Sequence, residues 1–382
     1  MTDGFHMEDI NKLREQFPIT KNKVFLNHAA QSPLPKPVAD VMHKYIDEDS
    51  NFGTTSAEWN DGGKANFAKL IGAHPAEIAF VENTSVGLNV VANMLNYPRG
   101  SKIVTTDLEY PSAVYPWLRK RLGVNVYYVK NVKGEILLDD VEKAVDDKTV
   151  AVVVSHVEYA NGFRHNLKVL SEIAHQHDAY LIVDAIQSVG TMPVDTKRDD
   201  VDFLALSCYK WLLSPPGVGY LYVKDELIDK FEPPLVGWAS VNQEIFETTD
   251  MYDIYEMPLA KTASRFQAGT PSYLSLTAAD AAMKMLLDFG IENVHKRIIH
   301  LTDCLIENVK KLRLEVQTPE EKHHRSGIVN FKIHEPEKVV QKLRKKGIVV
   351  SARANGIRVS PHFYNTEKEI DRLVKEIKSL KG

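Results

Sequence analysis

Residues 180–190 read YLIVDAIQSVG, an apolar run that ends in a carboxylate before a turn. Four consecutive apolar residues predict a strand buried on both faces, which is typical of a parallel sheet covered by helices. Helical spacing occurs between such runs, at residues 111–121 and 166–177. The alternation predicts an α/β fold with a mainly parallel sheet of six or seven strands. The other strand-like runs are residues 102–105, 124–129, 149–154, 203–206 and 218–223.

The pattern changes after residue 271 to long helical stretches, at residues 273–289 and 291–312. We therefore predict a large domain over residues 26–290 and a smaller α+β domain over residues 291–382, with residues 1–25 packing on the small domain. The elements expected in the small domain are a strand at 328–333, a helix at 336–346, paired strands at 348–352 and 357–360, and a helix at 366–381.

Charge and cysteine content limit the classes of partner. The 382 residues contain 47 Lys and Arg against 51 Asp and Glu, so no positive excess is available for nucleic acid, and a small-molecule partner is favoured. Two cysteines, Cys208 and Cys304, are too few for a disulfide framework and indicate free thiols. The acidic N-terminal stretch does not resemble a signal peptide and no window has the apolar length of a membrane span, so we expect a cytoplasmic protein.

A lysine follows one of the predicted strands. Residues 206–211 read LSCYKW, which places Lys210 just beyond the strand at 203–206. Ligands of open α/β sheets bind beyond the carboxyl ends of the strands, where a lysine can form a Schiff base with a carbonyl. The alternative is a solvated surface lysine, the commoner situation for this residue type.

A carboxylate ends the neighbouring run. Asp184 follows a buried strand and needs a positive or donor partner, and Gln187 lies on the next turn. An acid that faces a protonated pyridine nitrogen keeps the ring cationic, as pyridoxal phosphate chemistry requires. An aspartate that caps a turn is the alternative.

Hydroxyl residues precede a third apolar segment. Residues 82–89 read ENTSVGLN, so Thr84 and Ser85 stand where a helix is predicted to begin. Helix N-termini bind phosphate, although an ordinary N-cap has the same sequence pattern.

Together these residues resemble the class V aminotransferase family of pyridoxal-phosphate enzymes. That family has fold type I and includes cysteine desulfurases, isopenicillin N epimerase-like proteins and kynureninase. The resemblance runs in order along the chain, which makes it more specific than any single motif. Its parts are LNHAAQSP at 26–33, Asp184 with Gln187, SCYK at 207–210, RFQAGTP at 265–271, and Arg358 followed by YNT at 364–366.

The resemblance implies a complete cofactor site. Lys210 would hold the cofactor as a Schiff base, Asp184 would bind the pyridine nitrogen, and Gln187 would donate to the ring oxygen. No metal site is expected. The remaining cofactor-binding residues that the resemblance implies are Thr84, Ser85, Ser207 and Tyr209 at the phosphate and Tyr110 stacked on the ring.

The resemblance also implies the substrate side. Arg358 would bind the substrate carboxylate with two parallel hydrogen bonds, the alternative being a solvated arginine on an edge strand. Asn27 and His28 are candidates for the substrate side, although His28 is equally a candidate structural histidine. Tyr159 and Arg164 are candidates for contact with cofactor or substrate.

Gly269 and Thr270 match the family segment that reaches the phosphate of the neighbouring subunit. The resemblance therefore implies a homodimer with shared active sites.

One departure from the family bears on the reaction. Desulfurases use a nucleophilic cysteine shortly before the carboxylate-binding arginine, whereas residues 351–357 read SARANGI. We therefore expect a pyridoxal-phosphate enzyme that acts on a small amino acid by transamination or related chemistry. A C–S lyase resembling the desulfurases and an amino-acid epimerase are alternatives, and a non-catalytic cofactor-binding scaffold is a more remote one.

Overall fold

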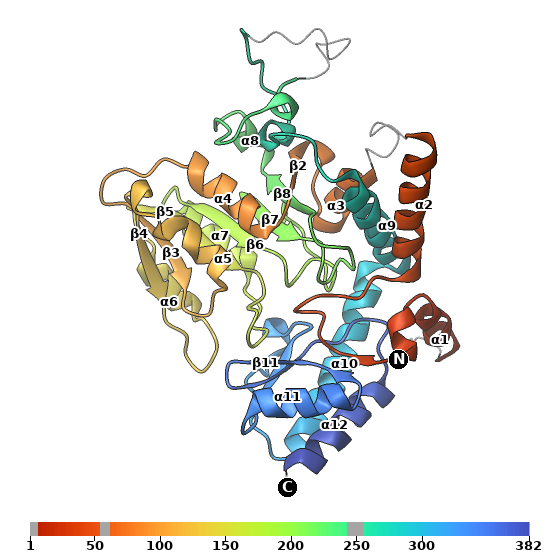
Figure 1. The fold of residues 1–382 in the computed structure, drawn as a ribbon. Coiled ribbons are helices and arrows are strands. Elements are labelled where there is room, and N and C mark those ends of the chain that lie inside the picture. The colour runs from red at the N-terminus through yellow and green to blue at the C-terminus, as the bar shows by residue number, and fades with distance from the viewer. Residues whose placement is uncertain (1–6, 54–61, 243–254, 382) are drawn as a thin grey trace.

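The computed structural model describes residues 7–53, 62–242 and 255–381. Its main sheet has the strand order β2-β8-β7-β6-β5-β3-β4 (Figure 1). Strands β4, β3, β5, β6 and β7 pair in parallel, β8 is antiparallel to β7, and β2 is antiparallel to β8. The predicted α/β fold with a mainly parallel, seven-stranded sheet is confirmed. The strands are β2 (Ile78–Val81), β3 (Lys102–Thr106), β4 (Asn125–Val129), β5 (Thr149–Ser155), β6 (Tyr180–Asp184), β7 (Phe203–Ser207) and β8 (Gly219–Val223).

Both faces of this sheet are buried. Leu181 and Val183 belong to one hydrophobic core and Ile182 to another, because alternate residues of a strand point to opposite faces. Helices α2 and α3 both pack on α9, beside the sheet in Figure 1. The helices of this region are α2 (Lys36–Phe52), α3 (Gly62–Ile71), α4 (Thr84–Met94), α6 (Leu138–Ala144), α7 (Leu167–His175), α8 (Asp225–Ile228) and α9 (Tyr273–Phe289).

Two elements differ from the sequence prediction. Strand β2 was not among the predicted strands, because its four residues are too few to show a clear pattern. The helix expected at 111–121 is only α5 (Pro111–Val114), followed by 3-10 turns at Tyr115–Leu118 and Lys120–Leu122. Pro116 explains the break, because a proline inside a helix removes one hydrogen bond and clashes with the preceding turn.

The C-terminal part forms a second sheet with the order β11-β12-β9 and its own hydrophobic core. Residues 348–349 do not pair with β12 as predicted. They form β10, which lies parallel to β1 near the N-terminus, and only β11 pairs with β12. The elements are β1 (Val24–Phe25), α10 (Ile291–Lys311), β9 (Val329–Lys332), α11 (Pro336–Lys345), β10 (Ile348–Val349), β11 (Ser351–Arg353), β12 (Gly356–Val359) and α12 (Glu367–Lys381).

The N-terminal helix α1 (Met7–Glu15) lies beside the C-terminal helices (Figure 1). Arg14 forms an ion pair with Glu369 at 2.9 Å and donates to the carbonyl of Tyr364. The domain boundaries at residues 25 and 290 stay predictions. None of the helices within the described ranges is both long and apolar enough to cross a membrane.

Candidate functional site

Lys210 and Asp184 lie at the carboxyl ends of neighbouring strands. Asp184 ends β6, which pairs with β7, and Lys210 follows β7 in a turn that is closed by a bond from the Leu213 N–H to the Lys210 carbonyl (3.1 Å). Both side chains are buried. Burial lowers the pKa of Lys210 to about 8, while the negative charge of Asp184 acts in the opposite direction. Lys210 is therefore a partly neutral amine near pH 8.

The Asp184 carboxylate is only partly satisfied by the protein. Its Oδ1 accepts a hydrogen bond from the Ile186 N–H at 2.9 Å, and Oδ2 has no hydrogen-bond partner in the described part of the chain. Burial raises the pKa of Asp184 to about 6, opposed by the Ile186 N–H and by Lys210. A buried carboxylate with a free oxygen is suited to a protonated nitrogen as its partner.

The predicted phosphate residues gather at the start of α4. The Thr84 N–H donates to Ser207 Oγ at 2.8 Å, and the two hydroxyls lie 3.0 Å apart. Ser85 Oγ lies 2.8 Å from Ser112 Oγ, a residue of α5 that the sequence did not single out. Hydroxyl groups clustered at the N-terminus of an 11-residue helix form a suitable phosphate site.

Gln187 is anchored behind the site. Its Nε2 donates to the Ala29 carbonyl at 3.0 Å, and its Oε1 accepts from the indole N–H of Trp211 at 2.8 Å. The amide therefore has one N–H left for a ring oxygen.

His28 and Asn27 differ in what their polar atoms can do. Both ring nitrogens of His28 bond to the protein, Nδ1 to the Ser360 carbonyl (2.9 Å) and Nε2 to the Tyr364 hydroxyl (2.8 Å), and the side chain is fully buried. The geometry therefore favours the structural role for His28. In contrast, Asn27 Oδ1 is buried without a hydrogen-bond partner among the described residues.

Arg358 is brought to the same region from β12. Its Nη1 donates to the Tyr159 carbonyl at 2.8 Å and its Nε to Ser351 Oγ at 3.3 Å. It is 2% exposed and forms no ion pair with a carboxylate of the described residues. Burial lowers the pKa of Arg358 to about 10, and the positive charge of Arg353 adds to the effect. A buried cation without an anion favours an anionic ligand.

Two aromatic rings line the space between the lysine and this arginine. The Tyr110 ring meets the Tyr159 ring edge-on, with centroids 5.1 Å apart. Lys210 Nζ lies 5.8 Å from the centroid of the Tyr110 ring and equally far from that of Tyr209. Tyr110 and Tyr209 therefore belong to the surroundings of the reactive amine, as the sequence predicted.

Arg164 lies elsewhere. Its Nε donates to the His323 carbonyl at 2.8 Å, and it lines a separate pocket with Met192 and Arg198. No contact joins it to Lys210, so the suggested contact of Arg164 with cofactor or substrate has no support in the geometry.

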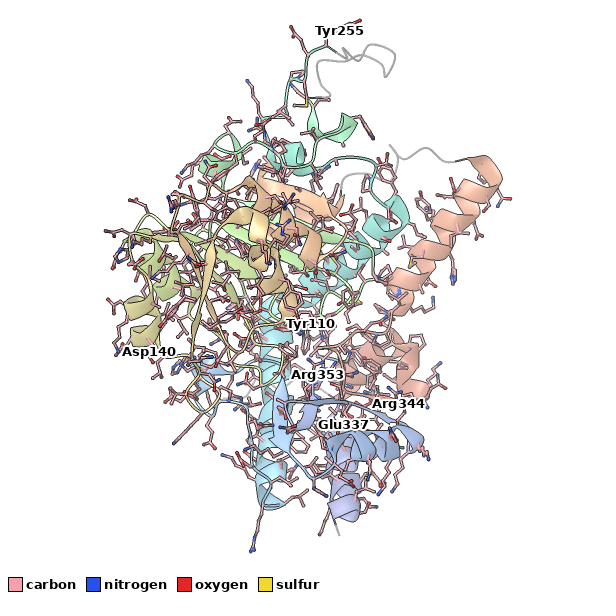
Figure 2. All side chains as sticks on the ribbon, turned by 60° about the vertical axis from the view of Figure 1, so that its left-hand side comes forward. Tyr110, Asp140, Tyr255, Glu337, Arg344 and Arg353 are labelled. Carbon is pink, nitrogen blue, oxygen red and sulfur yellow. The ribbon has the colours of Figure 1, made fainter. Side chains whose placement is uncertain are left out.

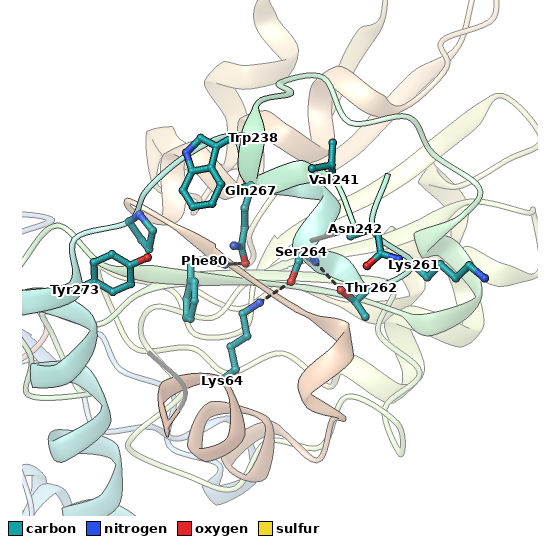
Figure 3. A pocket seen from close by; sticks show the side chains of 13 residues that line it. Lys64, Phe80, Trp238, Val241, Asn242, Lys261, Thr262, Ser264, Gln267 and Tyr273 are labelled. Carbon is teal, nitrogen blue, oxygen red and sulfur yellow. Dashed lines mark hydrogen bonds between the residues drawn. The ribbon is translucent and has the colours of Figure 1, made fainter. Parts of the chain in front are cut away.

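Gly269 and Thr270 are exposed. They line a pocket together with Glu82 and Val86, next to the start of α4. A second pocket of about 350 Å³ adjoins this segment (Figure 3). There Lys64 Nζ donates to Ser264 Oγ at 2.8 Å.

Sequence reasoning missed a buried acidic pair behind the site. Both oxygens of Glu109 accept hydrogen bonds of 2.6 Å from Ser155, the residue that pairs with Asp184 across β5 and β6. Glu158 is hydrogen-bonded to Thr106 Oγ1, and burial raises its pKa to about 8. Each glutamate follows a buried strand, so the argument that identified Asp184 also applies to them.

The two thiols lie away from the arginines. Cys208 is buried, and burial raises its pKa. Cys304 lies on α10, 3.8 Å from the Nε2 of His300, and desolvation raises its pKa as well. Neither is an activated thiolate.

The sequence matches the family model described as aminotransferase class-V over residues 24–373. The chain is 31% identical to the uncharacterized aminotransferase YcbU of Bacillus subtilis, over 95% of this chain and 96% of that protein. It is also 31% identical to a protein of Pyrococcus abyssi named "probable cysteine desulfurase", over 96% of both chains.

Solved structures of the same architecture cover the whole chain. The apo structure of a cysteine desulfurase from Thermococcus onnurineus NA1 has a TM-score of 0.88 at 28% identity, covering 100% of this chain and 99% of that one. The cystine C–S lyase C-DES, solved with cysteine persulfide, has a TM-score of 0.86 at 23% identity, covering 95% and 99%, and shows the shared fold.

Proposed function

Since the chain belongs to the class V aminotransferase family of pyridoxal-phosphate-dependent enzymes, we propose that Lys210 binds the cofactor and that Arg358 holds the carboxylate of a small amino acid. The observation that carries this proposal is a buried lysine of lowered pKa beside a buried carboxylate, at the ends of neighbouring strands. Perturbed titratable groups that converge in this way are typical of active sites.

The residues present fit pyridoxal phosphate. Lys210 would bind its carbonyl carbon, the free oxygen of Asp184 its pyridine nitrogen, and the remaining N–H of Gln187 its ring oxygen. Thr84, Ser207 and the N-terminus of α4 would bind its phosphate.

When bound, the cofactor supplies an electron-poor ring that delocalises negative charge from the substrate α-carbon. The chain's residues do the rest. Arg358 orients the substrate by its carboxylate, and Lys210 Nζ removes the α-proton as a general base. Asp184 holds the proton on the pyridine nitrogen, and Tyr110 covers the reacting atoms against water.

The fate of the proton decides the reaction. Its return to the cofactor carbon gives transamination, its return to the α-carbon gives epimerisation, and loss of a β-substituent gives a lyase reaction. We place transamination or related chemistry first, with the C–S lyase and the epimerase as alternatives.

The thiol positions bear on the lyase alternative. The chain has two cysteines, both with raised pKa values and neither in residues 351–357. They support a lyase in which sulfur leaves with its own electrons, rather than a persulfide relay through an enzyme thiolate. The low cysteine content also supports the cytoplasm as the compartment.

A homodimer with shared active sites is part of the proposal. The exposed Gly269 and Thr270, beside the start of α4, are its basis. Sedimentation is expected to give a dimer, and Thr270→Ala is expected to weaken cofactor binding. A fully active monomer would contradict this part.

A screen of amino acids with the holoenzyme tests the proposed function. Keto acid, ammonia and sulfide release are measured for the wild type and for Lys210→Ala, with Lys143→Ala, an exposed lysine paired with Asp140, as the matched control. We expect turnover in the wild type and control and a loss of roughly a thousandfold in Lys210→Ala. Binding of the cofactor without turnover of any amino acid would instead favour the scaffold.

A further inference from the structure

The hairpin of β11 and β12 carries a second arginine beside Arg358. The two strands are joined by a two-residue turn in which Ala354 and Asn355 have φ values of +47° and +57°. Two successive positive φ values are typical of the tight type I′ turn, which fixes the strand register. In that register Ser351 lies opposite Arg358, and Arg353 lies opposite Gly356.

Arg353 and Arg358 therefore lie on the same face of the hairpin. Cross-strand partners share a face, and so do residues two apart in a strand, so Ser351, Arg353 and Arg358 project to the same side. That side faces the active-site segment, because Arg358 donates to the Tyr159 carbonyl. Asn330, the partner of Arg358 on β9, donates from Nδ2 to the Ala160 carbonyl at 2.8 Å.

The backbone at Arg353 is held in place. Its carbonyl accepts a hydrogen bond of 3.0 Å from Asn330 Nδ2, and the Ala354 carbonyl accepts another from Gln317 Nε2. Gly356 permits this close packing, because a Cβ there would lie 2.3 Å from Asn330 Oδ1. Arg353 thus stands on a preorganised support rather than on a loose loop.

The charge of Arg353 is not balanced by the protein. Its guanidinium is exposed, and within the described ranges its only hydrogen bond goes to the Ala352 carbonyl, with no carboxylate in ion-pair range. Arg358 also lacks a carboxylate partner there. Figure 2 labels Arg353 on the small sheet and Tyr110 on the opposite side of the site. The positive charge of Arg353 reaches Lys210 and lowers its pKa, as that of Arg358 does.

We propose that Arg353 binds a second anionic group of the substrate, so that the preferred substrate is an α-amino acid with an acidic side chain. The inference rests on the proposed function, in which Arg358 holds the α-carboxylate. An acidic side chain would neutralise a cation that otherwise repels Arg358 and would bond to the several free N–H groups of the guanidinium. A carboxylate and a sulfinate both have this chemistry.

Substrate binding by the holoenzyme tests this inference. The change in cofactor absorbance and kcat/KM are measured with L-aspartate, L-glutamate and L-cysteine sulfinate, which separate the two acid types and two lengths, and with L-alanine and L-serine as neutral probes. The variants are Arg353→Met, which removes the charge but keeps much of the apolar stem, and Arg353→Lys. The control is Arg344→Met, an exposed arginine on α11 (Figure 2).

In the wild type we expect at least one acidic amino acid to bind more tightly than the neutral ones. Arg353→Met should weaken that binding by about 10- to 100-fold, the usual loss for a hydrogen-bonded charge pair, and leave the neutral probes within about twofold. Arg353→Lys should restore part of the loss, and Arg344→Met should change nothing.

The outcomes separate this inference from the proposed function. If neutral amino acids turn over but no acidic one is preferred, or if Arg353→Met weakens all probes equally, Arg353 is a solvated surface arginine and only this inference falls. If the protein neither binds the cofactor nor turns over any probe, the proposed function fails, and the substrate assignment falls with it.

Discussion

Two regions meet at Lys210, and they differ in how their charges are balanced. At the ends of β6 and β7, the positive charge of Lys210 faces the negative charge of Asp184, and Thr84 bonds to Ser207. On the β11–β12 hairpin, the guanidinium of Arg358 bonds to a carbonyl and a hydroxyl, and no described carboxylate pairs with it. The first region is organised by its own residues, whereas the second is left positive. A ligand that brings negative charge completes the second region.

The largest expected effect breaks the balanced region. Asp184→Asn removes the charge that would keep the pyridine nitrogen protonated, so we expect the variant to fold and to bind cofactor but to lose roughly 100- to 1,000-fold in kcat. Steady-state kinetics and the cofactor absorbance measure the two properties separately. Turnover near that of the wild type would refute the role of Asp184.

Breaking the positive region should affect function and stability in opposite directions. Arg358→Met is expected to lower kcat/KM about 100-fold, mainly through KM, because the substrate carboxylate loses its partner. Thermal unfolding should be unchanged or shifted to higher temperature, since a buried cation without a carboxylate partner is removed. A variant that is destabilised while its kinetics are unchanged would make Arg358 a structural residue.

The pH dependence of Lys210 sharpens the same comparison. Its pKa of about 8 lies below the ordinary lysine value because of burial, and only the neutral amine attacks a carbonyl. The rate at which cofactor-free enzyme combines with pyridoxal phosphate should therefore rise with pH up to about pH 8 and then level off. Asp184 raises the pKa of Lys210, so Asp184→Asn should move this midpoint to lower pH. A rate that keeps rising to pH 10 would contradict the burial argument.

The smallest effect is expected from the cysteines. Cys208→Ala combined with Cys304→Ala should leave kcat/KM within about twofold, because both thiols have raised pKa values and neither lies on the hairpin. Sulfide and persulfide release from cysteine and cystine are the assays. If the parent releases sulfur and the double variant does not, while the cofactor stays bound, an enzyme thiol takes part after all.

The sequence predicted the balanced region better than the positive one. Asp184 and Lys210 follow apolar strands, and the carboxyl ends of parallel strands share one edge of the sheet, so periodicity alone brings them together. Periodicity does not say which neighbours a side chain meets. The bond of Gln187 to Trp211 and the burial of the Glu109 and Glu158 carboxylates follow from tertiary packing.

The hairpin shows a second limit of prediction from sequence. Residues 348–352 looked like one strand because their apolar pattern is continuous, yet β10 pairs with β1, which is more than 300 residues away. Arg353 was not predicted to be functional, since an arginine before Ala354-Asn355 is an ordinary turn flank. Its importance depends on the register that sets it on the same face as Arg358.

Reduction of the holoenzyme with borohydride, followed by peptide mapping, tests the central claim most directly. Borohydride converts the Schiff base of the cofactor into a stable amine, so the modified lysine can be identified by mass. We predict that the pyridoxyl group is found on Lys210, and that Lys210→Ala carries no specific label. A label on a different lysine, with Lys210 unmodified, would contradict the account.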